Sequence, residues 1–153
     1  MKIEEEINQS KFSSAPEKAI VNIIYTSNFI QDTYKTALKL YDISLPQYNV
    51  LRILKGRKDG HATCGDLKEV MLDKNPDVTR LCDKLVEKKL ILRNFNKNNR
   101  RQILLRISEK GLKVLSDINP YFAELNEMLK DLPEQDLLNL SDTLDKIREK
   151  VRG

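Results

Sequence analysis

Apolar residues recur at intervals of three and four along most of the chain, the spacing that places them on one face of an α-helix. The pattern therefore predicts a protein built mainly from helices. Its first stretch, residues 16–41, predicts one long helix. Residues 108–130 predict a second long helix, bent near Pro120, and residues from 134 onward predict a third.

Two shorter helices are expected between these long ones, because each has a recognisable start. Ser44 stands three residues before Gln47, which is the spacing of a capping box, and this helix should end near Gly56. Thr63 stands three residues before Asp66 and predicts the start of the next helix, which is shorter.

A third short helix, the fourth helix in chain order, is expected after residue 75, with Asn75 as its cap and Pro76 in its first turn. Its apolar stripe consists of Val78, Leu81, Cys82, Leu85 and Val86. Two short helices joined by a tight turn, the second with one apolar stripe, are typical of a helix-turn-helix.

A β-hairpin should follow, because "LILRNF" and "RQILLRI" are short apolar runs separated by a polar segment, residues 96–100. A hairpin after a helix-turn-helix is a wing. The expected fold class is therefore mainly α with a small β-hairpin wing, that is, a winged helix-turn-helix flanked by long helices.

Charge is concentrated in the middle of the chain. The whole sequence carries a formal charge of +4, but residues 46–107 hold 15 Lys and Arg against 7 Asp and Glu. Phosphate contacts dominate nucleic-acid affinity, so a basic centre between mildly acidic ends indicates a module that binds a polyanion. A lysine-rich solvated surface is the alternative.

The candidate DNA-binding side chains lie on the fourth helix and on the wing. They are Asn75, Asp77, Val78, Thr79, Arg80, Lys84, Lys97, Asn98, Arg100 and Arg101. Polar residues near a helix N-terminus can donate to phosphates and base edges, and wing arginines can reach a minor groove. An ordinary amphipathic helix and a hairpin kept soluble by its charge would carry similar residues.

The runs "LPQYNVLRIL", "DLKEVMLDKNPDVTRLCDKLVEKKLILR" and "NNRRQILLRISEKG" occur in an order and spacing that resembles the MarR family of bacterial winged helix-turn-helix regulators. The resemblance covers roughly residues 45–112. It implies that the recognition helix contains Val78, Thr79 and Arg80, and that the wing's arginine pair is Arg100 and Arg101. Family wings carry an aspartate before that pair, where this chain has Asn98 and Asn99, and its loss makes the tip more positive.

The long terminal helices are expected to form a homodimer, which the resemblance also implies; packing within one chain is the alternative. The domains expected are a dimerisation segment at 1–45, the DNA-binding domain at 46–107 and a second dimerisation segment at 108–153. A two-fold dimer reads a pseudo-palindrome. The function predicted is a sequence-specific transcriptional regulator, a repressor, with double-stranded DNA and itself as partners. The alternative is a winged-helix adaptor that binds proteins instead of DNA.

The resemblance further implies release by a small amphipathic or phenolic ligand, with Tyr34, Tyr41 and Tyr48 as candidate pocket residues; aromatic residues at helical spacing also form cores. No enzyme, cofactor or metal site is expected. His61, the single histidine, has no second histidine at metal-ligand spacing, and glycine-rich phosphate loops are absent from the sequence.

Two cysteines make no disulfide framework, so a reducing cytoplasm is the expected compartment. The start of the chain does not resemble a secretory signal, and the apolar runs are too short for a membrane span. Cys82 belongs to the apolar stripe. Cys64 begins a helix, which leaves a cysteine-based redox sensor as a further alternative.

Overall fold

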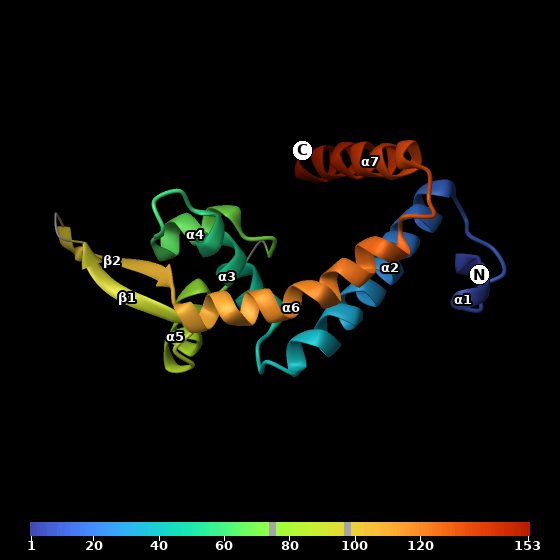
Figure 1. The fold of residues 1–153 in the computed structure, drawn as a ribbon. Helices are drawn as coiled ribbons and strands as arrows, with labels where there is room; N and C mark the ends of the chain where they lie inside the picture. The colour runs from blue at the N-terminus through green and yellow to red at the C-terminus, as the bar shows by residue number, and fades with distance from the viewer. Residues whose placement is uncertain (74–75, 97–98) are drawn as a thin grey trace. The chain divides into compact units, whose positions relative to one another are not determined.

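The chain folds into helices and one two-stranded antiparallel sheet (Figure 1). The computed structural model describes residues 1–73, 76–96 and 99–153, and only the backbone at Arg100 and Arg101. The elements in chain order are α1 (Ile3–Glu6), α2 (Ala15–Lys39), α3 (Leu45–Gly56), α4 (Cys64–Val70), α5 (Val78–Glu87), β1 (Ile91–Asn96), β2 (Asn99–Ile107), α6 (Glu109–Met128) and α7 (Glu134–Arg152). The predicted fold class is confirmed.

Contacts divide the chain into two compact units, Met1–Ile118 and Asn119–Gly153. The first unit contains α1 to α5, the hairpin and the beginning of α6. The second contains the rest of α6 and all of α7. The functional division at residues 45 and 107 stays a prediction.

The starts of α3 and α4 form as their sequences predict. The Oγ of Ser44 accepts a hydrogen bond from the Gln47 N–H at 3.4 Å, and the Gln47 side chain accepts one from the Ser44 N–H at 3.0 Å. Thr63 and Asp66 exchange the same pair of bonds at 3.1 and 2.8 Å. Each reciprocal pair satisfies two amides that the first helical turn leaves unpaired.

At the N-terminal end, α2 runs from Ala15 to Lys39, close to the predicted long helix, and Ser14 caps it. Helix α1 was not predicted, because four residues are too few to show a helical period. It is joined to α2 by an ion pair between Lys18 and Glu4 at 2.5 Å.

The hairpin is attached to the helices by the end of β2 that precedes α6. Strands β1 and β2 pair from Ile91 opposite Ile107 to Phe95 opposite Ile103, and the register shifts after Phe95. Ala62, just before α4, makes an isolated β-bridge to Leu105. Each residue donates its N–H to the carbonyl of the other, with N to O distances of 2.9 and 2.8 Å. The outer part of the hairpin extends away from α3, α4 and α5 (Figure 1).

One hydrophobic core holds α3, α4, α5, the base of the hairpin and the beginning of α6 together. Its largest fully buried side chains are Leu38, Leu51, Leu54, Leu67, Leu85, Ile91, Leu105, Leu115, Ile118, Val50 and Cys82. Because every central element contributes to it, this core fixes α5 and the base of the hairpin relative to each other.

Candidate nucleic-acid interface

Helix α5 begins at Val78 and is capped by Asp77, whose carboxylate accepts a hydrogen bond from the Arg80 N–H at 3.1 Å. The prediction that Asn75 caps this helix, with Pro76 in its first turn, is therefore wrong. A carboxylate three residues before Arg80 satisfies a free amide of the first turn, which an N-cap must do. Asn75 itself lies outside the described residues.

The two faces of α5 differ sharply in exposure. Val78, Cys82 and Leu85 are buried, as the apolar stripe predicts, whereas Thr79 and Arg80 in the first turn are exposed. Val78 was also a candidate DNA-binding residue. Since its side chain is 5% exposed and packs into the core, a contact of Val78 with DNA would have to use its main chain.

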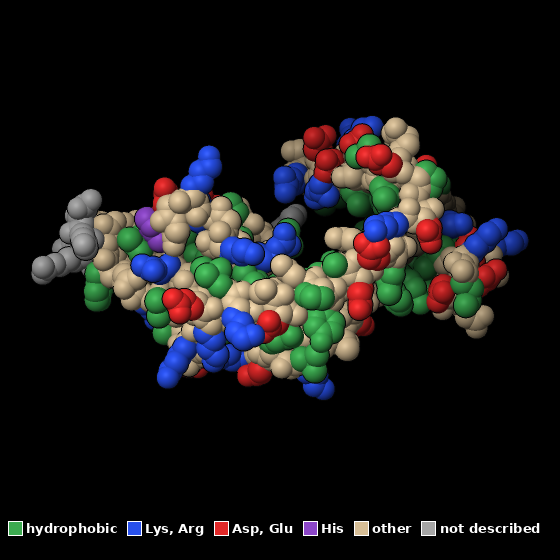
Figure 2. All heavy atoms as spheres, in the orientation of Figure 1, with side chains coloured by type: hydrophobic (Ala, Val, Ile, Leu, Met, Phe, Trp, Pro, Cys, Tyr) green, Lys and Arg blue, Asp and Glu red, His purple; other side chains and the backbone are tan. Residues whose placement is uncertain are grey.

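The exposed face of α5 carries two basic side chains, Arg80 and Lys84, and two acidic ones, Asp83 and Glu87. Lys84 is exposed one turn beyond Arg80, and the first turn of α5 contains no acidic residue beyond its Asp77 cap. The N-terminal end of a helix carries partial positive charge, which favours a phosphate there. Lys and Arg side chains gather over the part of the surface where α5 lies (Figure 2).

An ion pair joins α5 to the wing. The guanidinium of Arg93, on β1, pairs with the carboxylate of Asp83, on α5, and both side chains are partly exposed. Arg93 lies opposite Leu105 across the hairpin and therefore shares the face that turns toward the helices. This ion pair is a second attachment between α5 and the hairpin, in addition to the shared core.

Neither Asp83 nor Arg93 was a candidate site residue. Arg93 was expected in the hairpin, but nothing in the sequence pairs it with Asp83. They lie ten residues apart in different elements, so only the folded hairpin brings them together.

The wing tip carries the remaining candidates. The backbone of Arg100 and Arg101 lies in β2, while Lys97 and Asn98 lie outside the described residues. Beside the tip, the Asn96 amide donates to the Gln102 side chain at 2.6 Å, linking the two strands next to the register shift. The side-chain contacts predicted for this tip stay predictions.

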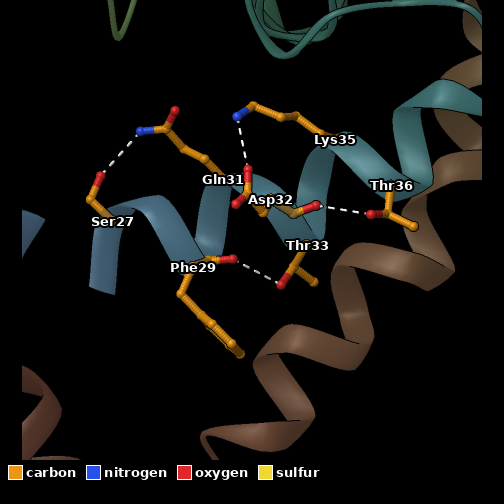
Figure 3. Close-up of polar contacts among 7 residues, drawn as sticks. All are labelled: Ser27, Phe29, Gln31, Asp32, Thr33, Lys35 and Thr36. Atoms are coloured by element: carbon orange, nitrogen blue, oxygen red, sulfur yellow. Dashed lines mark hydrogen bonds and ion pairs between the residues drawn. The ribbon is translucent and has the colours of Figure 1, made fainter. Parts of the chain in front are cut away.

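A groove of about 1030 Å³ lies between α2, the start of α3 and α5. Its lining includes Gln31, Lys35, Lys39, Asp42, Ile43, Pro46, Gln47, Met71, Leu81, Lys84 and Lys88. Gln31 and Lys35 point to one side of α2, whereas Phe29 and Thr33 point to the other (Figure 3). Lys88 forms an ion pair with Asp42 at 2.9 Å. The groove thus combines apolar walls with several ammonium groups.

The three candidate ligand-binding tyrosines are placed differently. Tyr48 is buried, with the Arg52 guanidinium 5.9 Å from its ring centre, and burial raises the pKa of its hydroxyl. Tyr41 donates from its hydroxyl to the Asp117 carbonyl at 3.2 Å. Tyr34 is partly buried. None of these tyrosines is among the described residues that line the groove, so their role in a ligand pocket stays a prediction.

The two cysteines have different surroundings. Cys82 is fully buried in α5, as its place in the apolar stripe predicts, and burial raises the pKa of its thiol to about 12. Cys64 is partly exposed at the start of α4.

Within the described ranges, no three His, Cys, Asp or Glu side chains are grouped as metal ligands would be. In the same ranges, none of the helices combines the length and the apolar character needed to cross a membrane.

Comparison with known proteins identifies the family. Residues 32–118, more than half of the chain, match the family described as transcriptional regulator SarA/Rot. The HTH-type transcriptional regulator MhqR of Bacillus subtilis (strain 168) is 26% identical over 119 residues, which cover 77% of this chain and 81% of MhqR.

Solved structures share the fold. S. aureus MepR in its DNA-binding conformation superposes with a TM-score of 0.71 at 22% identity, covering 84% of this chain and 95% of MepR. The organohalide-sensing regulator RdhR-CbdbA1625, in a form bound to 2,4-dichlorophenol, gives a TM-score of 0.78 at 18% identity. The match covers 93% of this chain and 86% of that regulator. The resemblance to MarR regulators is confirmed, and the chain belongs to the SarA/Rot family of winged-helix transcriptional regulators.

Proposed function

We propose that this regulator represses transcription by binding a pseudo-palindromic DNA operator as a homodimer. In each protomer the exposed first turn of α5, with Thr79 and Arg80, enters a major groove, and Arg100 or Arg101 on the wing enters the neighbouring minor groove. A dimer that covers its operator excludes other proteins from the same DNA, so repression is the expected outcome.

The observation that carries this proposal is the charge of the hairpin beside an exposed helix start. Residues 91–107 contain five Lys and Arg and no Asp or Glu. The Asp83–Arg93 ion pair connects this basic hairpin to α5, where Arg80 is exposed. A basic hairpin held in fixed relation to the exposed Arg80 of α5 can contact two neighbouring grooves of one duplex. A lysine-rich surface that is only solvated needs no such fixed relation between two elements.

Dimerisation is proposed from exposed apolar side chains on the long helices. On α2, Ile20, Ile24 and Phe29 are 55%, 56% and 66% exposed, and on α7 Leu140 is 55% exposed. Exposed apolar residues in such numbers mark surfaces that bury against a partner. A two-fold dimer would place two α5 helices about one DNA turn apart.

Release by a small amphipathic or phenolic ligand is proposed for the groove between α2 and α5. Its lining combines Ile43, Met71 and Leu81 with Lys39 and Lys84. A ligand bound there would contact the recognition helix directly through Lys84. It would weaken DNA binding only if it preferred the DNA-incompetent conformation.

Selection from a random double-stranded DNA pool tests the DNA-binding proposal. We expect the wild-type protein to enrich an inverted repeat with half-sites about one turn apart, and Arg80→Ala to lose that preference. Arg148→Ala is the matched control, because Arg148 is also an exposed arginine in a helix but lies on α7, where it pairs with Asp145. It removes the same charge and should keep the motif.

Salt dependence separates phosphate contacts from base contacts on the selected operator. The logarithm of the affinity falls linearly with the logarithm of the salt concentration. Lys84→Ala should reduce the magnitude of that slope by about 1 and leave the sequence preference unchanged. If the wild type enriches no motif and binds duplex DNA no better than a neutral protein does at low salt, the proposal fails, and a winged-helix adaptor that binds proteins becomes the better interpretation of the fold.

A further inference from the structure

The outer end of the hairpin carries an apolar pair that the core leaves exposed. Phe95 and Ile103 lie opposite each other in the strand register, so their side chains are neighbours on one face of the hairpin. Phe95 is 71% exposed and Ile103 is 43% exposed, whereas Leu105, two residues further along β2, is buried. The exposed pair therefore begins where the contribution of the hairpin to the core ends.

The same face of the hairpin holds its attachment to α5. Residues two apart in a strand point to the same face, so Phe95 shares its face with Arg93. Arg93 forms the ion pair with Asp83 of α5. The apolar pair thus lies on the side of the hairpin that turns toward α5, in the part that extends beyond the helices (Figure 1).

Positive charge lies on both sides of the apolar pair. Arg93 precedes Phe95 by two residues on β1, and the backbone of Arg101 precedes Ile103 by two residues on β2, about 7 Å away in an extended strand. Residues 91–107 contain no Asp or Glu. A polyanion that reaches from α5 to the wing arginines would therefore pass over the two apolar side chains.

The minor groove of DNA fits both features of this surface. Its phosphates provide the negative charge that the hairpin lacks, and its deoxyribose rings present C–H groups to an apolar side chain. Proteins that bind the minor groove commonly combine arginine with Phe or Ile in the same contact. A purely apolar partner would instead leave the surrounding cations without counter-charge.

We propose that Phe95 and Ile103 pack against the deoxyribose rings of the minor groove that the wing enters. This inference rests on the proposed function, because it requires the wing to lie in that groove. Contacts of basic side chains with phosphates weaken as salt rises, whereas an apolar contact with a sugar releases no counterion. Because every base pair carries the same sugars, the contact strengthens binding to the operator and to unrelated DNA alike.

A tryptophan reporter tests the contact, because the chain contains no tryptophan of its own. In free Phe95→Trp protein, acrylamide should quench the indole freely. Addition of operator duplex should shield the indole and shift its emission to shorter wavelength. Ile103→Trp places the same reporter on the other strand. Leu92→Trp is the matched control, since Leu92 is 46% exposed on the opposite face of β1 and should be quenched equally with and without DNA.

Affinity at several salt concentrations separates an apolar contact from a phosphate contact. Phe95→Ser should weaken operator binding by about tenfold at every salt concentration, because an apolar ring loses its buried contact. The slope of the logarithm of affinity against the logarithm of salt concentration should stay unchanged. Binding to unrelated duplex should weaken by the same factor. Leu92→Ser, which also replaces an exposed apolar residue of β1, should bind as the wild type does.

The inference is overturned if acrylamide quenches the Phe95→Trp indole equally with and without operator while anisotropy shows that the protein is bound. The proposed function stands in that case. Shielding of this indole already in the free protein also overturns the inference, because a second copy of the chain then covers the pair. If the wild type binds no DNA in the anisotropy measurement, the proposed function fails, and the inference fails with it.

Discussion

Gly111 has a buried position that leaves no room for a side chain. It lies in the first turn of α6, where its N–H donates to the Ser108 Oγ at 3.0 Å. The same serine donates from its hydroxyl to the carbonyl of Leu90, which follows α5. A Cβ on Gly111 would overlap the Leu90 carbonyl oxygen and lie 2.8 Å from the Ile107 side chain. The glycine therefore lets α6 lie directly against the junction of α5 and β1.

Replacing Gly111 by alanine should lower the free energy of unfolding by about 1–3 kcal/mol, the usual cost of overpacking, because backbone would have to move. Gly56→Ala is the control, since a Cβ at Gly56 meets no atom within 4 Å. Urea unfolding followed by circular dichroism measures both. Equal midpoints for Gly111→Ala and wild type would show that the junction is looser than the structure indicates.

Burial of Cys82 should also make stability depend on alkaline pH. The ordinary pKa of a cysteine, 9.0, is raised to about 12 at Cys82, chiefly by burial. The folded state thus holds this proton more tightly than the unfolded state. Its stabilising contribution is complete below about pH 9 and is lost as the pH rises toward 12.

The measurement is the unfolding free energy of the reduced protein as a function of pH, compared with that of Cys82→Ala. The variant should be less stable at neutral pH, because it leaves a small cavity, but its stability should fall less steeply above pH 9. Cys64→Ala should retain most of the wild-type dependence, since burial of Cys82, the main cause, is unchanged. Parallel curves for wild type and Cys82→Ala would contradict this account.

At the scale of elements, the sequence predicts those helix starts that are set by hydrogen bonds between residues close together in the chain. Ser44 and Thr63 mark helix starts correctly, because each cap is completed by a residue only three positions later. The same reasoning placed the start of α5 two residues too early, at Asn75, since an asparagine before Pro76 resembles a cap as closely as Asp77 does. Choosing between neighbouring caps depends on the fold around them.

Contacts between elements could not be predicted in this way. The sequence indicates both α5 and the hairpin, and their order indicates a wing, but it does not pair Asp83 with Arg93. This contact depends on the angle at which the hairpin meets α5, which the shared core sets.

The Asp83–Arg93 pair should matter more for DNA binding than for stability. The two side chains are 47% and 36% exposed, so removing either should change the unfolding free energy by less than about 1 kcal/mol. On the selected operator, Asp83→Ala and Arg93→Ala should each weaken binding, because the wing loses its second attachment to α5 and keeps only the one through the core. Their effects should be non-additive, with an interaction free energy of at least about 0.5 kcal/mol.

A double-mutant cycle in DNA affinity, measured by fluorescence anisotropy, tests this coupling. The control cycle uses Lys113 and Asp117, an exposed pair 2.9 Å apart within α6 and remote from the wing in sequence. Additive effects at Asp83 and Arg93 would mean that each contacts or repels DNA independently, and the ion pair would have no role in positioning the wing.

At the scale of the whole molecule, the proposed dimer would bury apolar side chains that the long helices expose. Helix α7 contains no buried residue, although Leu137, Leu140, Leu144, Ile147 and Val151 recur along it at spacings of three and four. On α2, Phe29 points away from the side that carries Gln31 and Lys35, which line the groove (Figure 3). One side of α2 thus lines the groove, and the proposed dimer would use the other side.

We therefore expect Ile24→Glu to convert a dimer into a folded monomer. Ile24 is 56% exposed in the single chain, so a glutamate there costs the monomer little, but in a dimer interface it would be an unpaired buried charge. Val70→Glu, at a site 51% exposed on α4, makes the same chemical change outside the long helices and should leave the dimer intact. Sedimentation equilibrium at micromolar concentration distinguishes the two states, and circular dichroism confirms that both variants fold.

The monomer should bind one half-site weakly and lose the preference for an inverted repeat, because a single protomer presents one α5 to the DNA. A wild type that sediments as a monomer, or an Ile24→Glu protein that stays dimeric, would remove α2 from the interface and require another explanation for its exposed isoleucines.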